Sequence, residues 1–490
     1  MQKSIVLVTV DCLRADHVGF MGYDRPTTPF LDSLAEESFV IPNAIAAGVP
    51  TYYSLPAILA ARFPLALGRD ILGVGPTEPT LASVLRDAGY ATGGFGAGNP
   101  YLSARFGYQQ GFDTFRDFLV DDMVHGADEK SSPLRQSWAS RLNHLLQAAR
   151  PLMGPLGSMY DELYFRYCQK VTPVPESLDA LRSFPAGDVV VDHAGDWLLS
   201  LGNKPFFLWL HLMDPHSPYY PKDAALSMLS QDSFTPQSAR YLNSFWNRSD
   251  LPPHRFQSHR GEIVALYDAG IRWADEQIRR LIGLLRSSNR WDDCIFALTA
   301  DHGEEFLEHG GRYHPPSHLF EELIHVPLLL RVPGIQKRRQ DDSPFSLMHL
   351  PPTLLDAARV PVPAEFQGRS VLGEMQVATP FGDVAISECV DGCTNPFRAE
   401  NRMGPRILAV RESRYKLVIH FGSGVENLYD LESDPAERSP IAPQTERAVR
   451  RRLLEVAREH LRRSIRQRDD QMRLHARLRD VQLDAARGRA

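Results

Sequence analysis

Short apolar runs along the chain alternate with segments whose apolar residues recur at helical spacing. Three runs are rich enough in β-branched, aromatic or other apolar residues to form buried strands, at residues 4–10, 205–212 and 294–299. Residues 262–285, between the last two runs, show the apolar periodicity of an amphipathic helix. Strands that alternate with helices predict a mostly parallel sheet flanked by helices. We therefore expect an α/β fold.

Three shorter helices are predicted in the first hundred residues. Thr28 precedes Pro29 in the order expected of a helix cap and the first helical position. A second helix should begin at about Thr51, and a third should span residues 80–89, where Gly89 closes it. We expect these helices to pack against the faces of the predicted sheet.

The pattern changes twice along the chain. Residues 1–379 predict one large domain, in which residues 120–185 form a helical insertion. Short strands such as 406–410 and 415–420 then predict a small antiparallel subdomain over residues 380–440.

Residues 441–490 hold 14 Arg against 7 Asp plus Glu and predict a basic amphipathic helical tail. Its apolar residues share one helical face: Leu454, Ala457, Leu461, Ile465, Leu474, Leu478 and Val481. Such a helix either packs on the body of the protein or forms a homodimer; contact with an acidic surface is the alternative.

Composition narrows the possibilities only slightly. A net charge of −6 over 490 residues argues against nucleic acid as the main partner. The 5 cysteines are scattered and predict neither a disulfide framework nor a zinc site. The chain opens with too short an apolar run for a signal peptide, and no run approaches the ~20 apolar residues of a membrane span. We therefore expect a cytoplasmic protein with no transmembrane segment.

Polar residues that follow the predicted strands suggest a metal site. Asp11 directly follows the first strand, and Asp301 and His302 follow the strand at 294–299. An aspartate at a strand end often caps a loop, but neighbouring parallel strands bring such residues to the same edge of a sheet. Two carboxylates and an imidazole suit Ca²⁺, Mg²⁺ or Mn²⁺, and the imidazole favours Mn²⁺.

Thr51 is the candidate nucleophile. A threonine hydroxyl needs a metal ion or a base to react at neutral pH. At the first turn of a helix it also lies beside backbone N–H groups that hold an anionic phosphate or sulfate. The alternative is that Thr51 only caps its helix.

The order of motifs resembles the sulfatase family of the alkaline phosphatase superfamily. The resemblance begins with Asp-Cys-Leu-Arg-Ala-Asp-His after the first strand and includes Asp-Pro-His at 214–216 and Asp-His-Gly-Glu at 301–304. The matching segments run in order along the chain: 10–17, 22–32, 51–64, 81–92, 111–113, 206–219, 301–304, 319–328 and 428–437. The resemblance implies an alkaline phosphatase-like fold whose catalytic domain is residues 1–379.

The resemblance also implies roles for single residues. Asp11, Asp301 and His302 match the metal ligands of the family. His216 matches the histidine that contacts the ester and acts as general acid toward the leaving oxygen. Asn99 is either a contact to the anion or a turn former. Among three histidines in the loop that faces the anion, we favour His314 over its two neighbours, His309 and His318.

Thr51 occupies the position at which the family has a modified cysteine. Sulfatases oxidise that residue to formylglycine in a Cys-x-Pro-x-Arg context, and this chain has Thr51, Tyr53 and Leu55 at those positions. Threonine cannot become formylglycine, so that chemistry is excluded. Cys12 stands where a second metal aspartate is usual, which weakens the case for Ca²⁺; it is either a metal ligand or a packed small residue.

We therefore expect a metal-dependent hydrolase or transferase that cleaves a phosphate or sulfate ester through Thr51, with one divalent ion bound by Asp11, Thr51, Asp301 and His302. A phosphodiester is favoured. The expected partner is a sulfated or phosphorylated small molecule, glycan or lipid headgroup. Two alternatives stay open: a sulfuric ester hydrolase that works without formylglycine, and a non-catalytic protein that binds such a glycan.

Overall fold

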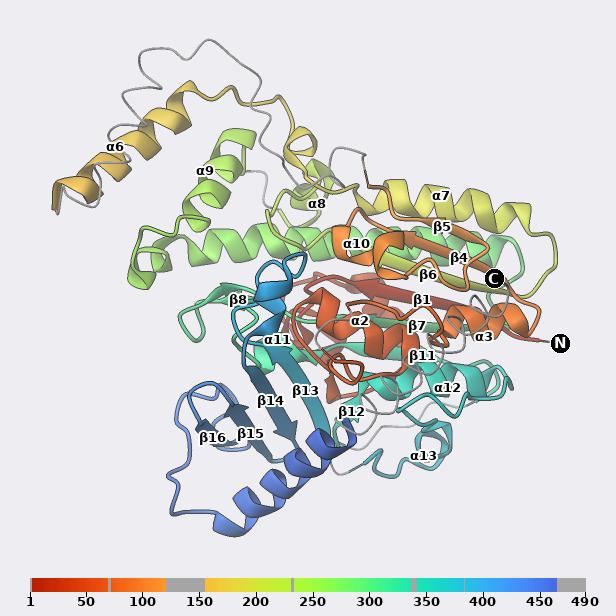
Figure 1. The fold of residues 1–490 in the computed structure, drawn as a ribbon. Coiled ribbons are helices and arrows are strands. Elements are labelled where there is room, and N and C mark those ends of the chain that lie inside the picture. Colours follow the sequence, from red (N-terminus) through yellow and green to blue (C-terminus); the bar gives the residue numbers. More distant parts are fainter. Residues whose placement is uncertain are drawn as a thin grey trace, which may run out of the picture.

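A seven-stranded sheet forms the centre of the protein (Figure 1). The computed structural model describes residues 2–68, 72–119, 155–230, 233–335, 342–382 and 384–464. The strands lie in the order β2-β11-β7-β1-β6-β4-β5. Their bounds are Ser4–Val10 (β1), Phe39–Val40 (β2), Ala91–Gly96 (β4), Thr114–Arg116 (β5), Phe206–Leu212 (β6), Cys294–Ala300 (β7) and Leu328–Arg331 (β11). The five strands from β7 to β5 are parallel, and β11 is antiparallel to both of its neighbours.

The three central strands β7, β1 and β6 are buried along almost their whole length. This explains why their sequences are continuous apolar runs without polar alternation. Two sets of helices cover the sheet: α1, α7 and α8 each pack against α10, and α2, α3 and α12 contact one another. Figure 1 shows α7 and α10 on one side of the sheet and α2 and α12 on the other. The predicted α/β fold with a mostly parallel sheet is therefore confirmed.

The predicted helices lie within a few residues of their expected positions. The helix expected at 262–285 is α10, Arg260–Ser287, and the helix expected from Thr51 is α2, Thr51–Ala60. The remaining helices are Pro29–Ala35 (α1), Leu81–Asp87 (α3), Pro155–Val171 (α6), Gly187–Ser200 (α7), Asp223–Met228 (α8), Pro236–Trp246 (α9), Glu321–Ile324 (α11), Leu350–Ala357 (α12) and Leu372–Val377 (α13). Short strands complete the loops: Ala44–Ile45 (β3), Glu305–Phe306 (β8), Arg312–Tyr313 (β9), His325–Val326 (β10) and Phe345–Ser346 (β12). None of the described helices has both the length and the apolar character needed to cross a membrane.

A separate antiparallel sheet follows in the C-terminal part of the chain. It contains β13 (Ala385–Val390), β14 (Arg406–Arg411), β15 (Tyr415–His420) and β16 (Val425–Asp430), paired in chain order. The helix at 447–464 packs on this sheet. The shared core is made by residues of both: Ile386, Leu408, Val410, Leu417, Leu428, Val449, Leu453 and Ala457.

Part of the apolar face of the predicted basic tail therefore packs against the C-terminal sheet of the same chain. Leu454 packs at the margin of this core. Ile465 and the predicted apolar residues beyond it lie outside the described residues, as do residues 120–154 of the predicted insertion. Helix α6 is the first described element of that insertion.

Glu388 in β13 joins three parts of the chain. Its buried carboxylate accepts hydrogen bonds from the Leu65 backbone N–H at 2.9 Å and from His460 Nε2 at 3.1 Å, and Arg406 lies 3.5 Å away. The backbone N–H of Glu388 donates to the Ala47 carbonyl at 2.9 Å. Burial opposes ionisation of this carboxyl, but Arg406 and His460 outweigh it and lower its pKa to about 2.

We predict that Glu388→Gln destabilises the protein by about 2–3 kcal/mol at pH 7, because a charged hydrogen-bond acceptor is lost from a buried site. A carboxyl whose pKa is lowered by folding contributes stability above its unfolded pKa and loses it as pH falls. The difference in unfolding free energy between the wild type and Glu388→Gln, measured by urea unfolding, should therefore narrow as pH falls from about 4.5 toward about 2. The surface variant Glu459→Gln is the control and should change little. An unchanged midpoint in Glu388→Gln would contradict this assignment.

Candidate active site

The predicted metal ligands meet at the carboxyl ends of β1 and β7. Val10 pairs with Ala300 in the sheet, so Asp11 and Asp301 follow two neighbouring strands at the same level. His302 Nε2 lies 3.5 Å from Asp301 Oδ2 and 3.7 Å from Asp11 Oδ1. All three side chains are fully buried, and a ligand atom from each lies within 4.8 Å of the others. Asp214 near β6 instead binds Arg182 and stays outside this cluster.

The donor atoms of this cluster fit a divalent ion. His302 Nδ1 contacts the Gly303 carbonyl at 2.8 Å, which leaves Nε2 as the ligand nitrogen. Asp301 Oδ1 accepts the His302 backbone N–H at 2.9 Å, while Oδ2 has no hydrogen-bond partner among the described residues. Buried carboxylates without partners are costly unless a cation or a proton neutralises them. Asp11, Asp301 and His302 would therefore hold the ion.

Two neighbours orient Asp11, and a third residue holds one of them. Its Oδ2 lies 3.1 Å from His211 Nε2 and accepts a hydrogen bond from Asn99 Nδ2, also at 3.1 Å. Thr9 Oγ1 lies 2.9 Å from His211 Nδ1 and fixes the ring. His211 had no predicted role, although a histidine inside the apolar run of β6 was a visible signal.

The two aspartates differ in their protonation. Burial by itself acts to raise the pKa of both carboxyls. For Asp11, the nearby imidazoles of His216, His211 and His302 outweigh burial and hold its pKa well below the usual range. For Asp301, burial and the charge of Asp11 keep the pKa raised. The metal-free site thus has one strongly ionised carboxylate beside one that retains a proton more readily.

Thr51 is the first residue of α2, and its side chain faces the metal ligands. Pro50 is the N-cap residue, and no side-chain capping hydrogen bond is present. The Thr51 hydroxyl donates to Asp11 Oδ2 at 3.4 Å and lies 3.2 Å from His302 Nε2. The alternative in which Thr51 only caps its helix is therefore wrong.

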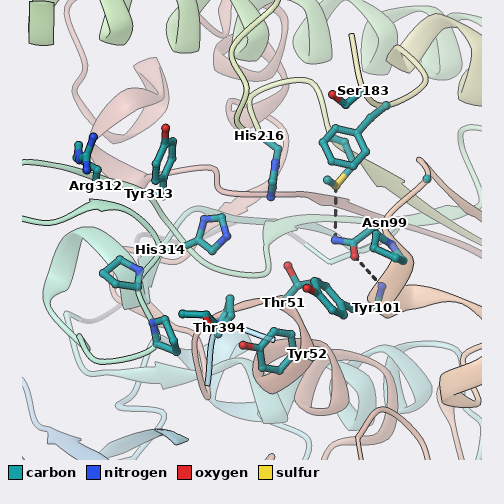
Figure 2. Close-up of a pocket in the computed structure, with 17 residues that line it drawn as sticks. Thr51, Tyr52, Asn99, Tyr101, Ser183, His216, Arg312, Tyr313, His314 and Thr394 are labelled. Atoms are coloured by element: carbon teal, nitrogen blue, oxygen red, sulfur yellow. Dashed lines mark hydrogen bonds between the residues drawn. The ribbon is translucent and has the colours of Figure 1, made fainter. Parts of the chain in front are cut away.

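A cavity of about 690 Å³ opens over Thr51 (Figure 2). Asn99, His216 and His314 all line it, and their contacts with a substrate stay predictions. Asn99 also forms a turn, because its Oδ1 accepts the Tyr101 backbone N–H at 3.0 Å. Aromatic and apolar residues form much of the remaining wall: Tyr52, Pro100, Tyr101, Phe184, Met213, Tyr313, Pro315 and Pro316. Sequence patterns did not identify these wall residues.

Only His314 of the three loop histidines lines the cavity. Its ring lies 4.7 Å from the ring of His302 and 5.2 Å from that of His216, measured between centroids. His309 instead contacts Glu322 Oε1 at 2.6 Å through Nδ1, and His318 contacts Glu305 Oε2 at 2.7 Å through Nδ1. Of these three histidines, His314 is the one that faces the cavity, and its contact with the anion stays a prediction.

A second cavity of about 450 Å³ adjoins the first. His216, Tyr313 and His314 line both cavities. The other residues of the second cavity are mainly polar: Ser217, Pro218, Tyr220, Asn243, Ser244 and Asn247. The site thus has an aromatic lobe and a more polar lobe that meet at the two histidines.

The fold and the site together define an α/β protein with a candidate divalent-metal site at the edge of a parallel sheet. The profile of the sulfatase family matches residues 3–360. A second profile, for the C-terminal part of N-sulphoglucosamine sulphohydrolase, matches residues 308–464. The chain belongs to the sulfatase family.

Known proteins support this membership. Arylsulfatase K from Gallus gallus is 27% identical over 287 residues, which cover 52% of this chain and 51% of that protein. The chain therefore spans about half the length of this curated relative. A solved 2-O GAG sulfatase is 17% identical with a TM-score of 0.64, covering 96% of this chain and 94% of that one. The phosphonate monoester hydrolase of Agrobacterium radiobacter is 18% identical with a TM-score of 0.60, covering 95% and 96%. Both structures share the fold.

We predict that Asp301→Ala lowers the divalent metal content of the purified protein by about one ion per chain, because one carboxylate ligand is removed. Elemental analysis after dialysis against trace metal measures this. Asp16→Ala is the matched control, since Asp16 lies on the surface in the same segment as Asp11 and should leave the metal content unchanged. Equal metal content in all three proteins would contradict the ligand assignment.

Proposed function

We propose that this protein cleaves a phosphoric or sulfuric ester with Thr51 as the nucleophile, assisted by a divalent ion at Asp11, Asp301 and His302. The observation that carries the proposal is the position of the Thr51 hydroxyl, 3.4 Å from Asp11 Oδ2 and 3.2 Å from His302 Nε2 at the edge of the cavity. A threonine that only capped its helix would not need to direct its hydroxyl toward the proposed metal ligands.

Thr51 is placed to be activated and to bind an anion at the same time. A bound Mn²⁺, Mg²⁺ or Ca²⁺ would lower the pKa of the hydroxyl and stabilise charge on the ester oxygens. The first turn of α2 adds backbone N–H groups and the positive end of the helix dipole. Thr51 Oγ1 would attack the phosphorus or sulfur and form a covalent ester on the protein.

His216 is the candidate general acid. Its Nδ1 contacts the Ser217 carbonyl, which leaves Nε2 for proton exchange. Figure 2 shows His216 and His314 at the wall of the same cavity as Thr51. His216 would donate a proton to the leaving oxygen, and His314 would contact the anion. Water or an alcohol would then release the group from Thr51, giving hydrolysis or transfer.

A phosphate ester is favoured over a sulfate ester by the nucleophile itself. Threonine cannot form formylglycine, on which the usual sulfatase reaction depends. The fold is shared with a protein described as a phosphonate monoester hydrolase. The sulfate alternative is supported by the name of the arylsulfatase relative.

The cavity walls suggest the kind of organic group on the ester. Arg312 is the one lysine or arginine among the described residues that line either cavity. Aromatic and proline side chains dominate the first lobe, and hydroxyl and amide groups are frequent in the second. This suits a singly charged ester, such as a phosphodiester, with one apolar and one polar substituent better than a densely sulfated glycan.

Thr51→Ala should lower kcat by at least about 10³-fold on a chromogenic phosphodiester or sulfate ester, whichever the wild type cleaves, because the attacking oxygen is gone. Thr51→Ser keeps an attacking oxygen and should restore much of the activity. Steady-state kinetics with both substrates separate the two ester classes. Full turnover by Thr51→Ala would overturn the nucleophile. Glycan or ester binding with no turnover by the wild type would favour the non-catalytic alternative.

A further inference from the structure

The second cavity beside the candidate active site is polar but offers no fixed charge to pair with an ion. Its volume is about 450 Å³. None of the described residues that line it is Asp, Glu, Lys or Arg. Apart from His216 and His314, its wall consists of hydroxyl, amide and proline side chains. A cavity of this composition suits a neutral group that carries hydroxyls better than a second anion.

Four side chains of this cavity have hydrogen-bonding atoms that the protein itself leaves unused. Ser217, Tyr220, Ser244 and Asn247 form no side-chain hydrogen bond with any other described residue. The first three are half-buried, and Asn247 is exposed. They belong to two segments, the loop after β6 and the end of α9. Hydroxyl and amide groups both donate and accept hydrogen bonds, so this wall matches a ligand with several hydroxyl groups.

Asn243, in the last turn of α9, fixes the shape of the cavity. Its Oδ1 accepts the Tyr219 backbone N–H at 2.6 Å, and its Nδ2 donates to the Tyr219 carbonyl at 3.0 Å. These two hydrogen bonds join the segments that carry the four unused side chains. The C-terminus of α9 also places the negative end of a helix dipole beside the cavity. That end disfavours an anion and favours the O–H groups of an alcohol.

The position of His216 indicates which part of a substrate the second cavity receives. Thr51 lines the first cavity and not the second, whereas His216 lines both. Figure 2 shows His216 across the first cavity from Thr51. In an in-line displacement the leaving oxygen lies opposite the attacking oxygen. With Thr51 as the attacking group and His216 as the acid, the alcohol on the leaving oxygen therefore extends past His216 into the second cavity.

We propose that the second cavity binds the alcohol that leaves the ester, and that this alcohol is a neutral group with several hydroxyls, such as a polyol or a sugar unit. Ser244 and Asn247 bind these hydroxyls and determine the preference for this alcohol. The inference rests on the proposed function, because it takes Thr51 as the nucleophile and His216 as the acid.

The roles of the atoms follow from this placement. Thr51 first loses its proton to solvent, and its Oγ1 then bonds to the phosphorus or sulfur. The bond from that atom to the leaving oxygen breaks, and the electron pair stays on the oxygen. His216 Nε2 supplies the proton of the new hydroxyl, so the alcohol leaves in neutral form from the second cavity.

Binding to the Thr51→Ala variant tests this subsite without turnover. The probes are 2,3-dihydroxypropyl methyl phosphate and propyl methyl phosphate, which differ only in two hydroxyls. The matching sulfate monoesters, 2,3-dihydroxypropyl sulfate and propyl sulfate, form a second pair. Isothermal titration calorimetry in the presence of Mn²⁺ measures the affinities. In whichever pair binds, the dihydroxypropyl ester should bind about 10-fold more tightly, because it gains hydrogen bonds in the cavity.

Variants of the cavity wall then locate the two hydroxyls. Ser244→Ala and Asn247→Ala, each made in the Thr51→Ala protein, should reduce the preference for the dihydroxypropyl ester by about 3-fold, because each removes one hydrogen bond. The two changes together should abolish it. Gln237→Ala is the matched control, since Gln237 is exposed on α9 outside the cavity, and should keep the full preference. Thermal unfolding followed by circular dichroism checks that each variant is folded.

Three results would overturn the subsite: equal binding of the two esters, binding of neither pair, and a preference that survives when Ser244→Ala and Asn247→Ala are combined. Failure of the proposed function would look different. A wild type that cleaves none of the esters, while Thr51→Ala keeps the binding preference, would reject ester cleavage and leave a polyol-binding cavity. Cleavage that depends on Thr51, together with equal binding of both esters, would reject only the subsite.

Discussion

Two buried carboxylates at adjacent strand ends are the constraint on which the site depends. β1 and β7 pair in parallel, so Asp11 and Asp301 emerge side by side in the protein interior. Their mutual repulsion in a medium of low polarity must be offset by positive charge. Polar nitrogen atoms of three surrounding residues point toward the two carboxylates: those of His302, His211 and Asn99. The proposed divalent ion would complete the charge balance at this pair.

The C-terminal antiparallel sheet helps to position the candidate active site. The segment that leads into Thr51 is fastened to β13 through the Ala47 carbonyl. A side chain at Gly48 would lie 2.6 Å from the Glu388 carbonyl oxygen, so only glycine permits this close approach. The position of the candidate nucleophile thus depends on a sheet more than three hundred residues further along the chain.

Sequence patterns predicted the parts of this site that lie at the ends of regular elements. Asp11, Asp301 and the helix beginning at Thr51 follow from strand and helix periodicity, and the family resemblance added His216 and His314. The role of His211 was missed because its partner, Asp11, becomes a neighbour only when β6 pairs with β1. The cavity wall was missed for a similar reason, since residues such as Tyr52, Phe184 and Pro315 come together through loops without periodicity. The unpartnered state of the Glu304 carboxylate could not be foreseen, because burial and missing hydrogen-bond partners are properties of the folded chain.

We propose that Thr51 carries the transferred group during the reaction. Mass spectrometry of the peptide that contains Thr51, after brief exposure to substrate and quenching in acid, tests it most directly. We expect a covalent phosphoryl or sulfuryl group on Thr51 that is absent from Thr51→Ala treated in the same way, and the added mass identifies the ester class. Rapid turnover with the group attached to another residue, or with no adduct at any time in the first turnover, would contradict it.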